Sequence, residues 1–391
     1  MFLPFEISAV GESLFPQAQK IATEIAHPHA INVDLDARFP HETIDALREA
    51  RLLGAYVPTE LGGEGATVSD IAAVCYALGQ GCSSAAMVFA MHQIQVACLV
   101  HHGLGVPGLR SYTERVAAEQ LLLASATTEL GIGGDVRNSL CAVNMDEKEF
   151  SLRKEAPVIS YGEDADAIMV TARRSSDAAS SDQVIVVVDR SDAQLTQIST
   201  WDTLGMRGTC SNGYLLEAKG SRDRVLPEPY ADISARTMLP VTHIWWASLW
   251  LGIATDAVNA ARSHLRVLAR RSAGDSPAVA SDVAVLFADL EMVSATVGSA
   301  LRLYESLASD PASLTASGVV LRMNSLKTSV STAVVRIVGQ ALTIVGIAGY
   351  RNDESNSIAR QLRDAHSAVL MVHNERILLN SGRLLCVYKD L

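Results

Sequence analysis

The spacing of hydrophobic residues changes twice along the chain. Over roughly the first 125 residues, apolar positions recur every three to four residues, the spacing of amphipathic helices. The segment FPHETIDALREARLLG, at 39–54, has a proline near its start and a glycine at its end, both typical of helix termini. In SDIAAVCYALG, at 69–79, we expect a second helix that is capped by Ser69 or Asp70 and ended by Gly79.

Between residues 126 and 228 the pattern becomes that of short strands. The runs AIMVTAR (167–173) and QVIVVVD (183–189) are rich in β-branched residues, and the turn-like segment RSSDAASSD separates them. After Pro229 the helical spacing returns, with Asp310-Pro311 as one helix start and Gly349 as one helix end. The predicted C-terminal helices lie near 233–271, 278–309, 312–348 and 358–388.

This order predicts a mainly α protein with an inserted β domain. We expect an N-terminal helical domain at 1–125, a middle β domain at 126–228 and a C-terminal helical bundle at 229–391.

Composition and charge narrow the possible partners. The 391 residues are 49% hydrophobic, and 43 acidic against 32 basic side chains give a net charge of −11 without a block of like charge. A nucleic-acid surface or a basic membrane-binding segment is therefore not expected. The apolar stretch at 238–258 carries His243 and Asp256, which favours a buried helix over a membrane span.

The N-terminal residues and the cysteines indicate a cytoplasmic protein. MFLPFEISAVGES lacks the basic and apolar regions of a signal peptide. Widely spaced cysteines without a C-x-x-C pair are typical of reduced core thiols, and they are Cys75, Cys82, Cys98, Cys141, Cys210 and Cys386. The spacing also indicates no metal site.

A glycine-rich segment, ATTELGIGGDV at 126–136, lies where the first helical part meets the β domain. Gly131, Gly133 and Gly134 allow positive φ angles, and they let backbone N–H groups approach a ligand. An ordinary tight loop is the alternative, because such a motif is weak evidence without its context.

Five segments in the same order along the chain resemble the acyl-CoA dehydrogenase family of flavoproteins. They are YVPTELGGEG (56–65), ATTELGIGGDV (126–136), APVISYGEDADAIMV (156–170), LGMRGTCS (204–211) and GYRNDESNSIARQLRDA (349–365). The resemblance implies an N-terminal helical domain, a middle β-barrel and a C-terminal four-helix bundle. It also implies an FAD cofactor and a homotetramer or dimer.

The same resemblance implies which residues bind FAD. Thr127, Thr128 and the backbone after them, including Gly133, would meet the pyrimidine edge of the flavin ring. Ile159 and Ser160 would approach the flavin N5 atom. Four more residues occupy positions where the family contacts the cofactor, with Arg270 or Arg271 on the diphosphate of a neighbouring subunit: Arg270, Arg271, Thr343 and Gly346. At two positions around Gly346 the chain departs from the family, because Thr343 stands where glutamine is common and Ile347 where a second glycine would be. A solvated cation at a helix end is the alternative for either arginine.

The chain departs from the family at the catalytic base, which takes the acidic α-proton of an acyl thioester. Val372 occupies the usual glutamate position, and Thr242 occupies the position used by other relatives. His243, beside three tryptophans, is the first candidate for a replacement, and His373 is the second. A core histidine and a surface imidazole are the respective alternatives.

Three functions remain open from the sequence. The first is an FAD-dependent dehydrogenase that acts on an acyl thioester of CoA or a carrier protein, with an electron-acceptor flavoprotein as a possible partner. The second is a flavin-dependent monooxygenase of the same fold, which needs no base for an α-proton. The third is a non-catalytic flavoprotein. The end-to-end resemblance favours the first.

Overall fold

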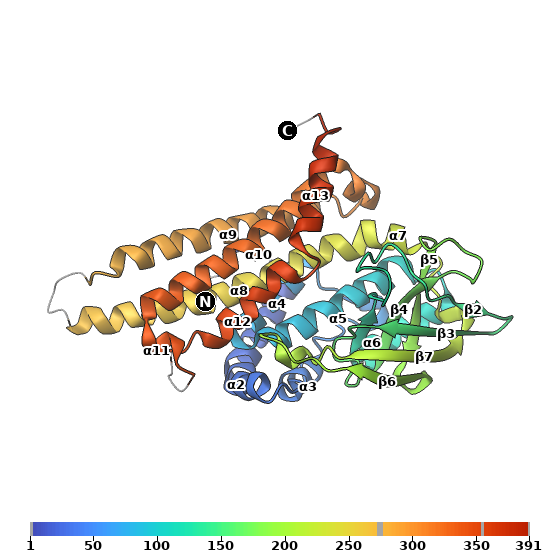
Figure 1. The fold of residues 1–391 in the computed structure, drawn as a ribbon, viewed down its shortest axis with the longest axis horizontal. Coiled ribbons are helices and arrows are strands. Elements are labelled where there is room, and N and C mark those ends of the chain that lie inside the picture. The colour runs from blue at the N-terminus through green and yellow to red at the C-terminus, as the bar shows by residue number, and fades with distance from the viewer. Residues whose placement is uncertain (1–2, 272–276, 353–355, 390–391) are drawn as a thin grey trace.

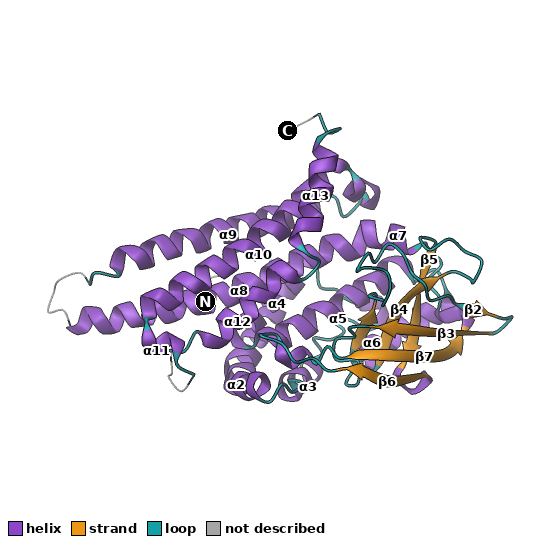
Figure 2. Cartoon of the chain, viewed as in Figure 1, coloured by secondary structure: helices purple, strands orange, loops and turns teal. Residues whose placement is uncertain are grey.

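The computed structural model describes residues 3–271, 277–352 and 356–389, and in it a long array of helices meets a smaller body of strands (Figure 1, Figure 2). The predicted fold class, mainly helical with strands in the middle of the chain, is confirmed. The helices before the strands are α1 (Ala9–Ile21), α2 (His27–Leu35), α3 (His41–Glu49), α4 (Val68–Gly81), α5 (Ser83–His102) and α6 (Pro107–Glu119).

The start of α4 differs from the prediction by two or three residues. Thr67 is the cap: its hydroxyl accepts a hydrogen bond from the Asp70 backbone N–H at 3.2 Å, and the Asp70 carboxylate accepts one from the Thr67 N–H at 2.8 Å. Ser69 and Asp70 therefore lie inside the helix, because this reciprocal pair satisfies two N–H groups at once.

Gly79 does not end α4, which continues to Gly81. A Cβ atom at Gly79 would lie 2.4 Å from the carbonyl oxygen of Leu249, and one at Gly252 would lie 2.4 Å from that of Tyr76. These glycines allow α4 and α8 (Leu239–Arg271) to pack backbone against backbone. Gly79, which was predicted to end the helix, is thus a point of close contact between α4 and α8.

The strands form two sheets. One has the order β1-β4-β5, with β1 parallel to β4 and β4 antiparallel to β5. The other is antiparallel with the order β2-β3-β7-β6. Their bounds are β1 (Leu123–Ala126), β2 (Asn144–Met145), β3 (Glu149–Ala156), β4 (Ala167–Arg173), β5 (Gln183–Asp189), β6 (Ala193–Ser199) and β7 (Gly213–Ser221).

The helices after the strands begin with the short α7 (Tyr230–Ile233), which leads into α8. In Figure 1, α8, α9 and α10 lie side by side along the long axis, and α13 projects from the body. The remaining bounds are α9 (Ala280–Ser306), α10 (Ser317–Val345), α11 (Ile347–Tyr350), α12 (Ala359–Leu370) and α13 (Asn374–Leu385).

Two helix predictions in this region are wrong. The helix α10 ends at Val345, and Gly346 follows it with a φ of +70°, so Gly349 is not the stop. The continuous helix predicted for 358–388 is divided into α12 and α13. At the break Val372 has a φ of +47°, which a β-branched residue seldom adopts.

The apolar stretch at 238–258 lies largely inside the fold as part of α8, as predicted. Three other helices among the described residues are long and apolar enough to cross a membrane: α5, α9 and α10. The fold buries 89% of the most apolar window of α5, but only 39% of that in α9 and in α10. The last two helices therefore leave apolar side chains on the outside.

The cysteines are free thiols. Four of them are buried, namely Cys75, Cys82, Cys98 and Cys141, as expected of core thiols. Cys386 is exposed, so the core interpretation is wrong for this position because α13 stands away from the body.

Candidate functional site

The loop that follows β1 is anchored by the buried carboxylate of Glu129. Glu129 accepts hydrogen bonds from the Cys141 N–H at 2.6 Å and from the Ser139 hydroxyl at 2.7 Å. The ammonium group of Lys154 lies 3.8 Å from Glu129 and donates to the carbonyl oxygen of Thr171 at 2.7 Å. Burial lowers the pKa of Lys154 to about 8, and the charge of Glu129 opposes that shift. The loop is thus tied to the neighbouring strands.

This anchored loop brings together four of the predicted flavin-binding residues. The Thr128 hydroxyl donates to the carbonyl oxygen of Val158 at 3.1 Å, which places Thr127 and Thr128 beside the segment with Ile159 and Ser160. The Ser211 hydroxyl donates to the Ser160 hydroxyl at 2.8 Å from the other side.

Several donors at this junction remain free. Among the residues that the structure describes, the backbone N–H groups of Thr128, Glu129 and Ser160 have no hydrogen-bond partner. The carbonyl groups and ring nitrogens on the edge of a flavin need such donors. The residues present therefore fit the ring edge of a flavin.

The glycine-rich segment takes the backbone shape that its sequence predicts. Gly131, Gly133 and Gly134 have φ angles of +89°, +59° and +74°. The guanidinium of Arg376, at the start of α13, donates to the carbonyl oxygen of Gly133 at 2.6 Å and also to that of Gly134. A Cβ atom at Gly134 would lie 3.1 Å from that guanidinium. No motif in the sequence predicts this contact, because it joins residues more than 240 positions apart.

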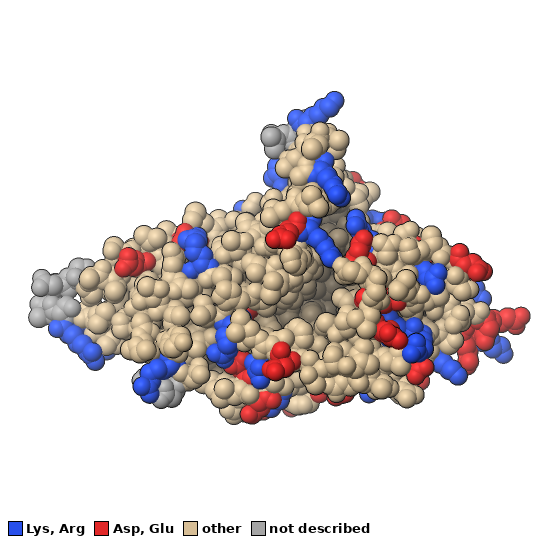
Figure 3. All heavy atoms as spheres, viewed as in Figure 1, with Lys and Arg blue, Asp and Glu red and all other residues tan. Residues whose placement is uncertain are grey.

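Figure 3 shows a hollow between the helices and the body of strands, below α13. Arg376 joins the glycine-rich segment to α13, so the C-terminal helix is attached to the strand side of the molecule.

One face of α8 carries three buried polar atoms without a hydrogen-bond partner among the described residues. They belong to His243, Trp246 and Trp250, spaced three and four residues apart and thus on one side of the helix. The His243 Nδ1 atom donates to the carbonyl oxygen of Met323 at 3.1 Å, whereas Nε2 has no partner. Burial, with a smaller effect of the Lys327 charge, lowers the pKa of His243 to about 4. This imidazole is neutral near pH 7.

Lys327 of α10 connects this face of α8 to the end of α12. Its ammonium donates to the Ala368 carbonyl oxygen at 3.1 Å and to Asn374 Oδ1 at 2.6 Å, and it lies 5.8 Å from the ring centroid of Trp250. Burial lowers the pKa of Lys327 to about 8.

The structure separates the other predicted residues from this group. His373 is exposed at the start of α13, and Val372 beside it is 47% exposed. Arg270 and Arg271 are exposed at the far end of α8, about 40 Å from His243 at 1.5 Å per residue. The exposed Thr343 donates to the Gly339 carbonyl oxygen, and Gly346 ends α10.

Thr343, Gly346 and the two arginines thus lie at the end of the bundle that points away from the strands (Figure 1). Within one chain they do not meet the loop after β1. For Arg270 or Arg271, the family resemblance implies contact with the cofactor of a neighbouring subunit. Among the described residues, no group of three or more His, Cys, Asp or Glu side chains is placed to hold a metal ion.

Family models match both helical parts of the chain. The acyl-CoA dehydrogenase N-terminal domain matches residues 12–106, and the acyl-CoA dehydrogenase C-terminal domain matches residues 234–371. The chain therefore belongs to the acyl-CoA dehydrogenase family, a family of flavin-dependent enzymes.

Its relatives within this family carry out different reactions. The amino sugar nitrososynthase DnmZ of Streptomyces peucetius is 29% identical over 349 residues, covering 86% of this chain and 84% of that protein. The cyclohex-1-ene-1-carbonyl-CoA dehydrogenase of Geobacter metallireducens is 25% identical over 349 residues, covering 88% and 89%. The FMN-bound structure of TdsC from Paenibacillus sp. A11-2 has the same fold, with a TM-score of 0.83, 18% identity and coverage of 97% and 98%. The dehydrogenase reaction is therefore one of several open to this fold.

Proposed function

We propose that this chain is a flavin-dependent monooxygenase whose substrate is an amine. The observation that carries the proposal is the absence of glutamate from both positions where the family places the base that removes the α-proton. Valine at 372 and threonine at 242 replace the family's two glutamate positions. A monooxygenase needs no base at either position.

His243 does not replace the missing catalytic base. Its side chain is 2% exposed, its Nδ1 atom is bonded to Met323, and its Nε2 atom has no measurable contact with solvent. A pKa of about 4 also makes it a weak base at neutral pH. A base must come within hydrogen-bond distance of the proton it removes, and this imidazole lies within the packing of α8 against α10.

The chain's own residues would hold and shield the cofactor. The free N–H groups of Thr128, Glu129 and Ser160 would bind the polar edge of the flavin ring, and the buried tryptophans of α8 would help to keep water from the reaction. When bound, a flavin kept reduced by a separate reductase would supply the two electrons with which O₂ converts a substrate N–H bond to a hydroxylamine N–OH and releases the second oxygen atom as water.

The choice of an amine follows from the amino sugar nitrososynthase, whose sequence aligns over most of both chains. As cofactor we propose FAD, with FMN as the second choice because the TdsC structure is FMN-bound. We further propose a homotetramer or dimer in the cytoplasm, in which Arg270 or Arg271 reaches the cofactor of a neighbouring subunit.

The test combines the flavin-loaded protein, a flavin reductase, NADH and an amino sugar nucleotide under ¹⁸O₂. We expect a product that is heavier by one ¹⁸O atom, and its formation should depend on both the reductase and O₂. Anaerobic bleaching of the flavin by an acyl-CoA, with no oxygenated amine, would overturn the proposal.

The second candidate is the acyl thioester dehydrogenase that the end-to-end sequence resemblance favours. The similarity to the cyclohex-1-ene-1-carbonyl-CoA dehydrogenase supports it, and His243 or water would have to act as the base. In that case flavin reduction by a thioester should fall at least tenfold in His243→Ala with flavin still bound. A flavin that neither substrate turns over would instead support the non-catalytic alternative.

A further inference from the structure

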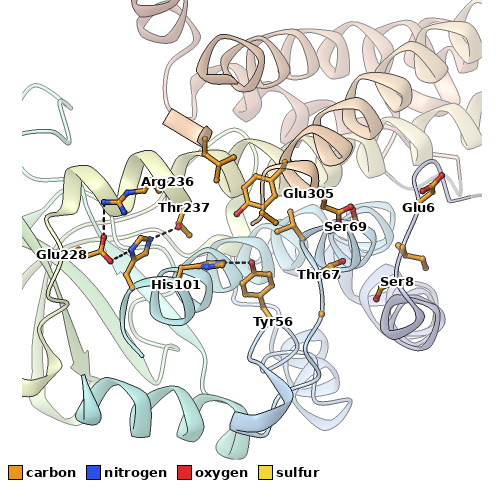
Figure 4. A pocket seen from close by; sticks show the side chains of 17 residues that line it. Glu6, Ser8, Tyr56, Thr67, Ser69, His101, Glu228, Arg236, Thr237 and Glu305 are labelled. Carbon is orange, nitrogen blue, oxygen red and sulfur yellow. Dashed lines mark hydrogen bonds and ion pairs between the residues drawn. The ribbon is translucent and has the colours of Figure 1, made fainter. Parts of the chain in front are cut away.

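A second cavity lies away from the loop after β1. It has a volume of about 600 Å³ and opens between the segment before α4, the end of α5, the segment that leads into α8 and the end of α9 (Figure 4). Thr127, Thr128, Ile159 and Ser160 do not line it. This volume falls within the range of small-molecule sites.

One end of the cavity holds side chains that pair with one another. The Glu228 carboxylate lies 3.0 Å from His102 Nδ1 and 3.3 Å from the Arg236 guanidinium, which also pairs with Asp232 at 3.3 Å. The Nε2 atom of His102 lies 2.8 Å from the Thr237 hydroxyl. Figure 4 shows Glu228, Arg236 and Thr237 together at this end. The Arg236 guanidinium is thus already paired, and a ligand group that reaches this end can form hydrogen bonds without a charge of its own.

The other end carries carboxylates without a cation. The Glu305 carboxylate accepts one hydrogen bond, from the Ser69 N–H at 3.3 Å. Over the described ranges of the chain, neither Glu305 nor Glu6 has an ion-pair partner, and Figure 4 shows both side chains at the cavity away from Glu228. Both side chains are exposed and ionisable, and a positively charged group in the cavity could pair with them.

Two largely buried residues at the cavity also carry hydroxyl groups without a partner. Ser69 and Tyr304 are 4% and 5% exposed, and their hydroxyl groups have no hydrogen-bond partner in the part of the chain that the structure describes. Neither oxygen is closed off from solvent, so both hydroxyl groups are accessible from the cavity and can bond to a molecule in it. The rings of Tyr304 and Tyr56 add aromatic surface, which also attracts cations.

We propose that this cavity binds a small primary amine. Its ammonium group pairs with Glu305 and Glu6 and contacts the hydroxyl groups of Ser69 and Tyr304, while its uncharged body lies against Tyr56 and reaches toward Glu228. This site is separate from the flavin site, and its occupancy does not depend on the proposed reaction.

The test uses tyramine as the probe and isothermal titration calorimetry with the flavin-loaded protein. Tyrosol, which has a hydroxyl group in place of the ammonium group, is the matched ligand. We expect tyramine to bind at least tenfold more tightly than tyrosol. We expect Glu6→Gln combined with Glu305→Gln to remove that difference.

Glu49→Gln combined with Glu114→Gln also removes two carboxylate charges, from exposed positions on α3 and α6 that do not line the cavity, and should leave tyramine binding unchanged. An unchanged melting temperature shows that each variant is folded. The proposal is overturned if tyramine does not bind, if tyrosol binds equally well, or if the double variant retains the wild-type affinity for tyramine. The last result would place the amine elsewhere, including at the flavin, and would leave the proposed reaction intact.

Discussion

Gly79 of α4 lies directly against the Leu249 carbonyl of α8, where a Cβ atom would come within 2.4 Å of the oxygen. Gly252 makes the reciprocal approach to Tyr76. The first helical part and the C-terminal bundle are therefore joined through backbone contacts. The helix that carries His243 and the tryptophans is fixed against α4 by this contact.

Gly79→Ala should destabilise the protein, because the added methyl group must separate α4 from α8. We expect a loss of about 2 to 4 kcal/mol in the free energy of unfolding, measured by urea denaturation. Gly339→Ala is the matched control, since this glycine lies in α10 with no atom within 4 Å of an added Cβ. That variant should gain about 0.5 to 1 kcal/mol. Equal effects at the two sites would contradict the close packing.

Arg376→Ala should loosen the glycine-rich segment, because the guanidinium holds the carbonyl groups of Gly133 and Gly134. Hydrogen exchange in a peptide that covers 130–137 should become about tenfold faster, as expected for the loss of about 1.4 kcal/mol of local stability. Arg383→Ala removes a charge from the same helix without touching the segment. Unchanged exchange in Arg376→Ala would show that α13 does not restrain the loop.

Acid should destabilise the protein partly through His243. Its ordinary pKa is 6.5 and burial lowers it to about 4 in the folded chain, so between these values the unfolded chain binds more protons. Stability therefore falls as the pH decreases from 6.5 to 4, and this histidine accounts for at most about 3 kcal/mol of the loss.

The measurement compares urea unfolding of the wild type and His243→Gln at several pH values. The variant should lose less stability between pH 6.5 and 4.5 than the wild type does. His264→Gln, on the same helix, controls for the removal of an imidazole. Parallel pH profiles of wild type and His243→Gln would refute the expected protonation.

Replacement of Arg270 and Arg271 by alanine should weaken FAD binding at least tenfold if either guanidinium reaches the diphosphate of a neighbouring subunit's cofactor. Flavin fluorescence gives the dissociation constants, and riboflavin, which lacks phosphate, should bind the variant and the wild type alike. Arg266→Ala, on an exposed part of the same helix, is the control. Unchanged FAD affinity would leave both arginines as solvated cations.

The sequence predicts the strands better than the helix ends. AIMVTAR and QVIVVVD coincide with β4 and β5, since a run of buried β-branched residues has few other structures open to it. The division between α12 and α13 was missed because no glycine or proline marks it. Val372 adopts a left-handed conformation there with no local signal in the sequence.

Part of the candidate site follows from sequence motifs and part does not. The resemblance predicted that Thr128 and Ser160 each contact the flavin ring, which stays a prediction, and the bond from Thr128 to Val158 places the two segments side by side. Arg376 and Lys327 could not be predicted, because each acts through contacts between distant helices or loops. The second cavity likewise combines residues from five separate stretches of the chain, and no single motif encodes it.

The exposed apolar sides of α9 and α10 are relevant to how the stability of this protein depends on its concentration. Val285, Phe287 and Met292 of α9 are each more than half exposed in the single chain. If a homotetramer or dimer covers them, then subunit dissociation and unfolding are linked by mass action, and the melting temperature should rise with protein concentration. A dilute sample would then hold more separated subunits, whose uncovered α9 side chains face water, and it would unfold at a lower temperature than a concentrated one.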